Sequence, residues 1–315
     1  MKILVTGSSG FIGFHLIEKL LNVGHNVIGI DNENDYYCQK LKFERKKRLN
    51  TKGFKFFKQD INDINNKFKN VDLAIHLAAQ PGVRLPKEKE YLYQSSNING
   101  FESFCDLCIR SKIQKIIYAS SSSVYCDLSS KKFSESNTKL NPKSIYGESK
   151  LANEVHASKI ASKFELNMVG LRFFSVYGPF GRPDMAYYSF TKSLKERKKI
   201  KLYNGGNMSR DMTYIDDIVQ GIMGSIDYIF KNENCSNEII NLGNDSPIST
   251  STLLFTLESK LRIKANFEIV NSSNEAFQTH ADISKAKKLL GYNPKVKFEE
   301  GISNFLNWHK DFEHL

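Results

Sequence analysis

The segment GSSGFIG, residues 7–13, follows the apolar run KILV and precedes a helical pattern over residues 11–23. Glycine at the first, fourth and seventh positions lets the backbone turn tightly, approach a pyrophosphate without an intervening Cβ, and pack helix against strand. The start of the helix then presents free N–H groups and the positive end of its dipole to the phosphates. We therefore predict that a dinucleotide is bound by Gly7, Gly10, Phe11, Ile12 and Gly13.

Acidic residues close the next two strand patterns. Asp31 ends NVIGID, at about the distance where a carboxylate accepts the ribose hydroxyls of a dinucleotide. A carboxylate there repels a ribose phosphate, so we predict NAD rather than NADP. Asp60 and Ile61 follow FKFFKQ and are placed to receive the adenine edge. A strand-end aspartate also commonly caps the following helix, and this alternative stays open for Asp60.

Strand-like runs alternate with helical runs through the first half of the chain, which is typical of a parallel sheet with crossover helices. The expected helices include residues 98–111 and 146–164, and beyond Gly178 the pattern breaks into shorter elements. We predict an α/β protein with a doubly wound parallel (Rossmann) sheet in residues 1–177, to which later segments return. Residues 178–315 are expected to form mainly a smaller, interleaved carboxyl-terminal substrate lobe.

Composition excludes several classes of protein. The chain has 315 residues, 40% of them hydrophobic, which supplies a globular core. The amino terminus MKILVTG enters a strand at once, and no apolar run approaches the roughly 18 residues of a membrane span. We expect a cytoplasmic protein without signal peptide or membrane insertion.

The formal net charge of +11 is spread along the whole chain, so we predict no nucleic-acid partner. The densest basic run, Lys40 to Leu49, is interpreted as a solvated helix face. A positive surface still favours an anionic ligand.

The chain has five cysteines, and two of them, Cys105 and Cys108, stand in CDLC within a helical pattern. They lack partners at metal-ligand spacing, so we predict reduced, partly buried thiols and no metal site.

The segment YGESK places Tyr146 and Lys150 four residues apart at the start of a helical pattern, so both side chains share a face. A free phenol titrates near pH 10, but an adjacent ammonium and a charged nicotinamide stabilise its phenolate. A serine at the end of the strand KIIYASS can bond the reacting oxygen as it changes between hydroxyl and carbonyl. The four serines of ASSSSVYC, residues 119–126, supply that hydroxyl.

These segments give the chain a clear resemblance to extended short-chain dehydrogenases/reductases of the nucleotide-sugar epimerase and dehydratase branch. The resemblance runs from VTGSSGFIG through HLAAQPGVR, YASSSSVY, YGESKLANE and RDMTYIDDIVQGI to THADISKAKKLLGY. Within that branch, NPKSIYGESK, GRPDMA and THADIS most resemble the UDP-glucuronate 4-epimerases.

The resemblance implies a role for particular residues. Ser121, Tyr146 and Lys150 match the catalytic serine, the acid/base, and the lysine that tunes it and binds the nicotinamide ribose. The cofactor would also contact Ala78 and Ala79. The substrate would contact Arg84, Ser121, Ser122, Ser123, Tyr146, Ser175, Arg182 and Arg210, with Arg210 on the diphosphate. Two residues depart from the family pattern, Pro81 in HLAAQPGVR and Cys126 after YASSSSVY, and both leave local loop geometry open.

The positions of Ser122 and Ser123 resemble Asp-Glu or Ser-Glu in sugar dehydratases and decarboxylating relatives. Because both are serine here, the proton-transfer pair for elimination is missing, and oxidation with re-reduction at carbon 4 remains. We interpret the serines, Ser175 and Arg182 as groups that hold a substrate carboxylate. The alternatives are a surface-loop role for Arg182 and a strand-end role for Ser175.

The resulting expectation is an NAD-dependent isomerase that inverts carbon 4 of UDP-glucuronate or UDP-galacturonate. The alternatives are an epimerase of a neutral UDP-hexose or UDP-N-acetylhexosamine, and a non-catalytic NAD-sensing or RNA-binding regulator. We also expect a homodimer, since helices 98–111 and 146–164 match those that form a four-helix interface in relatives. Leu151, Val155 and Ile160 lie at near-helical spacing and could face either the partner or the sheet.

Overall fold

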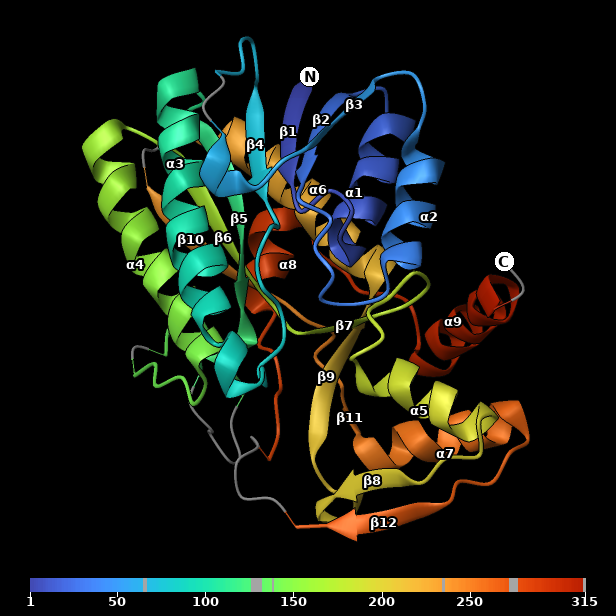
Figure 1. Ribbon diagram of the computed structural model, residues 1–315. Coiled ribbons are helices and arrows are strands. Elements are labelled where there is room, and N and C mark those ends of the chain that lie inside the picture. Colours follow the sequence, from blue (N-terminus) through green and yellow to red (C-terminus); the bar gives the residue numbers. More distant parts are fainter. Residues whose placement is uncertain (65–66, 126–131, 138, 234–235, 272–276, 314–315) are drawn as a thin grey trace.

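The computed structural model describes residues 1–64, 67–125, 132–137, 139–233, 236–271 and 277–313. Its centre is a seven-stranded parallel sheet with helices on both faces, and a smaller group of strands and helices lies below one end of it (Figure 1). Cys126 is outside the described residues. Among the described helices, none is long and apolar enough to cross a membrane.

The large sheet has the strand order β10-β6-β5-β4-β1-β2-β3. Its strands are β1 (Lys2–Thr6), β2 (Asn26–Asp31), β3 (Phe54–Lys58), β4 (Leu73–His76), β5 (Lys115–Ser121), β6 (Asn167–Phe173) and β10 (Asn237–Leu242). The central strands are buried on both faces, which explains their nearly continuous apolar runs. The chain reverses direction across the sheet between β1 and β4, and ligands bind beyond the carboxyl ends of strands at such a point. This confirms the predicted Rossmann architecture.

Two apolar layers hold helices to the sheet. On one face, α1 (Phe11–Asn22) and α6 (Ile215–Lys231) pack together, and α2 (Gln39–Leu49) lies beside α1. On the other face are α3 (Gly100–Ser111), preceded by the π-helical segment η3 (Tyr93–Asn99), and α4 (Ile145–Phe164). Phe101, Phe104 and Ile160 belong to this second layer, whereas Phe14 and Ile222 belong to the first.

The smaller lobe is built from segments that follow β6 in the chain, and they are interleaved with β10 of the large sheet. Its strands are β7 (Ser175–Tyr177), β8 (Ile200–Tyr203), β9 (Ser209–Tyr214), β11 (Pro247–Ser249) and β12 (Phe267–Val270). Its helices are α5 (Ala186–Lys195), α7 (Thr250–Leu261) and α9 (Phe298–Glu313), while α8 (Ser284–Leu290) packs on α6. Short helical turns are η1 (Ile61–Asp63), η2 (Lys87–Lys89), η4 (Ser122–Val124) and η5 (Asn204–Gly206). We keep the boundary near residue 178 as a proposal, with α6 and β10 as the segments that return to the first domain.

The basic run in α2 departs from the prediction of a solvated face. Lys42 is 5% exposed and Arg45 is fully buried. Arg45 donates from Nη1 to the Ser9 carbonyl at 2.9 Å and from Nε to the Phe180 carbonyl at 3.2 Å. The interpretation of this run was therefore wrong for two residues, because their charges satisfy backbone carbonyls inside the protein.

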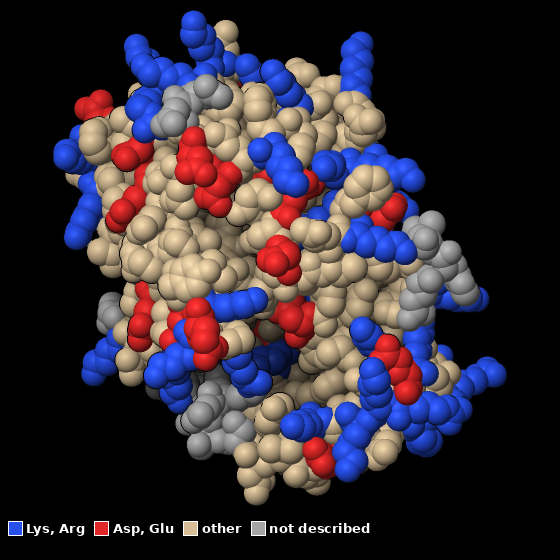
Figure 2. All heavy atoms as spheres, viewed as in Figure 1, with Lys and Arg blue, Asp and Glu red and all other residues tan. Residues whose placement is uncertain are grey.

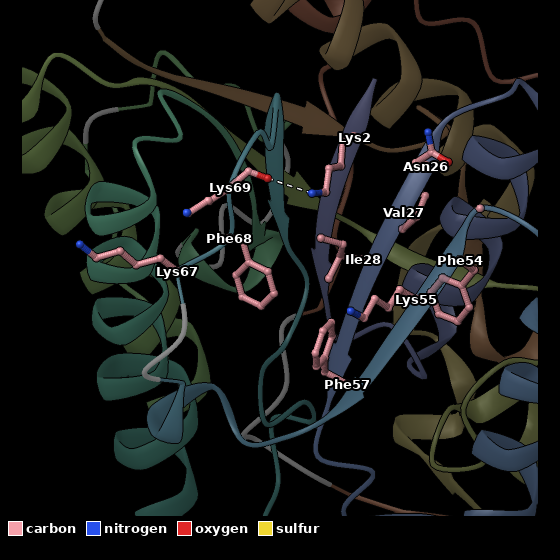
Figure 3. A pocket seen from close by; sticks show the side chains of 11 residues that line it. Lys2, Asn26, Val27, Ile28, Phe54, Lys55, Phe57, Lys67, Phe68 and Lys69 are labelled. Atoms are coloured by element: carbon pink, nitrogen blue, oxygen red, sulfur yellow. Dashed lines mark hydrogen bonds between the residues drawn. The ribbon is translucent and has the colours of Figure 1, made fainter.

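The remaining positive charge is dispersed, as Figure 2 shows for one face. A hollow of ≈ 640 Å³ lies at the amino ends of β1, β2 and β3, lined by lysines and phenylalanines that include Lys2, Lys55 and Phe57 (Figure 3). It lies toward the amino ends of these strands, whereas the glycine segment follows the carboxyl end of β1.

Cys105 and Cys108 are buried free thiols, and burial raises the pKa of both. The described residues contain no cluster that could hold a metal ion.

Candidate active site

A cavity of ≈ 1200 Å³ opens beyond the carboxyl ends of the large sheet, between the sheet and the smaller lobe. Every residue that the sequence assigned to a site lines it. They are Gly7, Gly10, Phe11, Ile12, Gly13, Asp31, Asp60, Ile61, Ala78, Ala79, Arg84, Ser121, Ser122, Ser123, Tyr146, Lys150, Ser175, Arg182 and Arg210. The fold therefore brings together segments from both lobes, whose individual roles stay proposals.

The glycine segment fits a dinucleotide. Gly7 has φ +71°, and a Cβ there would lie 2.7 Å from the Ala78 nitrogen. A Cβ on Gly13 would lie 2.2 Å from the Gly7 carbonyl oxygen. Both positions thus exclude side chains, for the left-handed turn and for close packing of α1 on β1. The open start of α1 is left facing the cavity.

Asp31 lies at the end of β2 with its carboxylate anchored to backbone. Oδ2 accepts from the Ser9 N–H at 3.0 Å and Oδ1 accepts from the Glu33 N–H at 2.7 Å. Burial raises the pKa of Asp31, and these two hydrogen bonds and the charge of Lys42 oppose that rise. A ribose phosphate would meet the Asp31 carboxylate here, which favours NAD. The contact with Ser9 also fixes the glycine loop, a role that sequence reasoning missed.

Asp60 takes the capping role that the sequence left open. Its Oδ1 accepts from the Asn62 N–H at 3.0 Å, and its Oδ2 accepts from Asn32 Nδ2 at 2.8 Å. Its side chain thus closes the turn η1 while the residue also lines the cavity. An adenine contact remains a proposal for Asp60 and Ile61.

The start of α4 places the two residues that the sequence predicts as the acid/base pair, Tyr146 and Lys150. Ser144 caps the helix by accepting from the Gly147 N–H at 3.1 Å. A Cβ on Gly147 would lie 2.3 Å from the Ser123 carbonyl oxygen, so the glycine lets the helix start press against the serine segment. One turn later Lys150 is 1% exposed and donates from Nζ to the Ala119 carbonyl at 3.0 Å. Burial lowers the pKa of Lys150 to about 8.

Tyr146 faces both a serine and two cations. Burial raises the pKa of its phenol, while the charge of Arg182 and a hydrogen bond with Ser121 lower it. The Lys150 ammonium lies 5.9 Å from the centre of the Tyr146 ring. The Ser121 oxygen accepts from the Ser123 N–H at 3.1 Å. This grouping can move a proton between the phenol and a sugar hydroxyl. The Ser121 hydroxyl can bond the same sugar oxygen during that transfer.

The serine segment divides between two tasks. Ser120 donates to Glu154 Oε1 at 2.5 Å, and Arg172 donates to the same carboxylate from Nε at 2.8 Å and from Nη2 at 2.7 Å. All three residues are buried. The bonds of Glu154 with Ser120 and Arg172 fix the carboxyl end of β5 on the side away from the cavity. Ser121, Ser122 and Ser123 then line the cavity. Glu154 lies within YGESKLANE, but no local signal indicated its partner.

The far wall carries the predicted substrate residues. Arg182 makes a side-on ion pair with Asp184, from Nε to Oδ1 at 3.0 Å and from Nη2 to Oδ2 at 2.5 Å. Ser175 begins β7, in keeping with its strand-end alternative. Arg210 donates to the Ser209 carbonyl at 2.8 Å, and the Arg84 guanidinium lies 5.4 Å from the centre of the Tyr203 ring. The sequence did not predict the carboxylate of Asp184.

Comparison with known proteins identifies this architecture. The family model described as "NAD dependent epimerase/dehydratase family" matches residues 3–243. The chain belongs to this family. Its cofactor is NAD, as the family's dependence and the NAD-bound structures of its relatives indicate.

Relatives match the chain from end to end. UDP-glucuronate 4-epimerase 1 of Arabidopsis thaliana is 39% identical, over 99% of this chain and 77% of that protein. An uncharacterized protein of Methanocaldococcus jannaschii is 43% identical, over 98% of this chain and 95% of its own length. The crystal structure of UDP-glucuronic acid 4-epimerase from Bacillus cereus, in complex with UDP-glucuronic acid and NAD, has a TM-score of 0.91 and 34% identity. It covers 99% of this chain and 100% of that chain.

Proposed function

We propose that this member of the NAD-dependent epimerase/dehydratase family is an isomerase that interconverts UDP-glucuronate and UDP-galacturonate by inverting carbon 4. The observation that carries the proposal is that one cavity holds Tyr146 together with Arg182 and three neutral serines. A dehydratase needs carboxyl groups where Ser122 and Ser123 stand. The similarity to UDP-glucuronate 4-epimerases supports the choice of substrate.

The reaction begins at the carbon 4 hydroxyl. NAD supplies a hydride acceptor and donor, held by the glycine loop, Asp31 and Lys150. Tyr146, as phenolate, takes the hydroxyl proton, and Ser121 stays hydrogen-bonded to the oxygen that becomes a carbonyl. The keto sugar would then turn about its phosphate linkage and expose its other face, so that carbon 4 would regain the hydride while Tyr146 gives the proton back to the oxygen. Arg84 and Arg210 hold the diphosphate during this turn.

A uronate makes this chemistry hazardous, because the intermediate is a β-keto acid that can lose carbon dioxide. Loss is fastest when the breaking carbon–carbon bond lies perpendicular to the carbonyl plane. Hydroxyls of the serine segment and Ser175, together with Arg182, hold the carboxylate out of that orientation. Neutral donors suit this purpose, since a carboxylate at position 122 or 123 would repel the substrate.

Incubation of the purified protein with UDP-glucuronate tests the proposal. We expect UDP-galacturonate to accumulate to a constant ratio without added NAD and without release of carbon dioxide, measured by chromatography and proton NMR. UDP-glucose and UDP-N-acetylglucosamine are run in parallel. Faster conversion of either neutral sugar would assign the protein to the second candidate function. No conversion of any UDP-sugar would favour a regulator.

The first prediction concerns cofactor retention. The hydride is borrowed and returned within one turnover, so the protein is expected to purify with NAD bound and to need none added. Denaturation followed by chromatography of the released nucleotides measures the occupancy. Absence of dinucleotide, together with a strict need for added NAD, would contradict this prediction.

The second prediction concerns assembly, since we propose a homodimer through α3 and α4. On α4, Val155 is 49% exposed, whereas Leu151 packs against the core and Ile160 is buried. Burying such an exposed apolar side chain across a partner helix favours association. Light scattering at micromolar concentration should give twice the chain mass, and Val155→Glu should shift it toward the monomer. Val23→Glu, 47% exposed at the end of α1, is the matched control and should remain dimeric.

We also propose a cytoplasmic location. The described cysteines Cys38, Cys105 and Cys108 are all free thiols, which suits a reducing compartment. Fractionation of cells with an antibody to the protein tests this location, and recovery in a secreted fraction would contradict it.

A further inference from the structure

A carboxylate lies where the proposed function needs positive charge. Asp184 lines the same cavity as Tyr146 and Arg182 and occupies one side of the Arg182 guanidinium. The Arg182 side chain is 22% exposed and the Asp184 side chain is 32% exposed, so water screens the attraction between them only in part. A substrate carboxylate would therefore meet a neutralised pair rather than a free cation.

The geometry leaves part of the arginine available. The ion pair uses Nε and Nη2, so Nη1 keeps its two N–H donors for another acceptor. Arg182 also remains close enough to Tyr146 for its charge to lower the phenol pKa. Nη1 can therefore bond a uronate carboxylate while Asp184 offsets the net attraction.

Asp184 is itself fixed from the other lobe. Tyr36, in the segment between β2 and α2, donates from its hydroxyl to Asp184 Oδ2 at 3.3 Å. A Cβ on Gly82 would lie 2.5 Å from the Tyr36 hydroxyl oxygen, so this tyrosine is packed tightly against the loop that carries Arg84. Burial, and after it the Asp184 charge, raise the pKa of Tyr36 to about 12. The tyrosine hence stays neutral and keeps its hydrogen for the carboxylate.

The backbone next to the pair is anchored as well. The Phe180 carbonyl accepts from Arg45 Nη2 at 2.5 Å, and the His15 ring nitrogen Nε2 lies 2.9 Å from the Pro179 carbonyl oxygen. The Phe180 ring packs on Phe14, with centroids 4.9 Å apart. Helices α1 and α2 of the cofactor domain thus hold the loop that presents Arg182 and Asp184.

We propose that Asp184 is a positioning and specificity-determining residue that moderates the hold of Arg182 on the substrate carboxylate. This role rests on the proposed function. The keto sugar must rotate, and its carboxylate must leave one set of contacts as it does so. If Arg182 held the carboxylate very strongly before the rotation, that interaction would stabilise the starting complex without lowering the barrier to rotation. Pairing with Asp184 keeps the interaction selective for a uronate yet weak enough to release.

The first arm of the test measures binding without turnover. In NAD-loaded protein carrying Tyr146→Phe, calorimetry compares UDP-glucuronate with UDP-glucose, with and without Asp184→Asn. Removal of the negative charge should tighten UDP-glucuronate by roughly tenfold, since the released arginine charge acts on the substrate. UDP-glucose should change by less than about twofold, because it carries no carboxylate. Asp35→Asn, the same chemical change at an exposed position of the Tyr36 segment, should have no effect.

The second arm measures turnover with Tyr146 intact. Asp184→Asn should lower the KM for UDP-glucuronate and also lower kcat by roughly tenfold, whereas a merely structural role would raise KM or leave the two unlinked. Tyr36→Phe removes the hydrogen bond but not the charge. It should therefore leave the preference for uronate over neutral sugar unchanged, and a shift as large as that of Asp184→Asn would overturn the charge argument.

The outcomes separate this inference from the proposed function. If the parent converts UDP-glucuronate but Asp184→Asn weakens both sugars in parallel, or changes neither, the role of Asp184 is wrong and the function stands. If the parent binds only neutral UDP-sugars, the proposed function fails, and the role of Asp184 fails with it. NAD occupancy and the Tm of each variant, with Asp184→Ala as a second substitution, show whether a loss reflects misfolding.

Discussion

Replacement of Tyr146 by phenylalanine is expected to lower kcat for UDP-glucuronate by roughly two or more orders of magnitude, the usual scale for loss of a general acid/base. The phenol is the group at the cavity that Ser121 bonds and that the Lys150 and Arg182 charges surround. Phenylalanine keeps the ring, whose centroid lies 6.2 Å from that of Tyr93, but cannot move a proton. NAD occupancy should therefore be unchanged while turnover is lost.

Single-turnover and steady-state assays on the same NAD-loaded preparation measure this effect. Tyr91→Phe is the matched control, since it removes a hydroxyl from a tyrosine that is 65% exposed, and it should retain full activity. Activity of Tyr146→Phe within a few-fold of the parent would remove Tyr146 from the acid/base role. Loss of NAD together with activity would instead indicate a structural effect.

Replacement of Arg182 by alanine is expected to weaken UDP-glucuronate by about 2–5 kcal/mol, the scale for truncating one partner of a desolvated charge pair. The loss is large because the variant also leaves Asp184 unpaired and facing the substrate carboxylate. Neutral UDP-glucose should be affected far less. The same variant should restrain the keto intermediate poorly, so a fraction of turnovers should end in decarboxylation.

Both effects have separate readouts. Calorimetry gives the two affinities, while decarboxylation releases a UDP-4-keto-pentose and strands the cofactor as NADH, seen as near-ultraviolet absorbance. Arg182→Lys retains a charge but not the side-on geometry, and it should fall between alanine and the parent. Unchanged relative affinity for the two sugars, with no NADH left behind, would make Arg182 a loop arginine and remove the best physical support for a uronate substrate.

Local backbone requirements made much of the site predictable from sequence. Gly7 and Gly13 are required because any side chain would collide with backbone less than 3 Å away. Tyr146 and Lys150 share a helix face because they are four residues apart, and Asp31 is found by its place at a strand end. Each of these signals lies within one or two elements, so the sequence by itself determined the Rossmann sheet and indicated the segments that we propose as the NAD loop and the acid/base pair.

Only the tertiary structure decided which distant charged and polar groups pair with the side chains around the site. Tyr36 and Asp184 meet although they are 148 positions apart, and Arg45 reaches Phe180 across 135. The basic run that contains Arg45 has the composition of a solvated helix, and nothing in its periodicity marks the one guanidinium that the fold buries. Periodicity records which face of an element is apolar. The partner of a buried charge depends on how distant elements pack, and that is set by the whole fold.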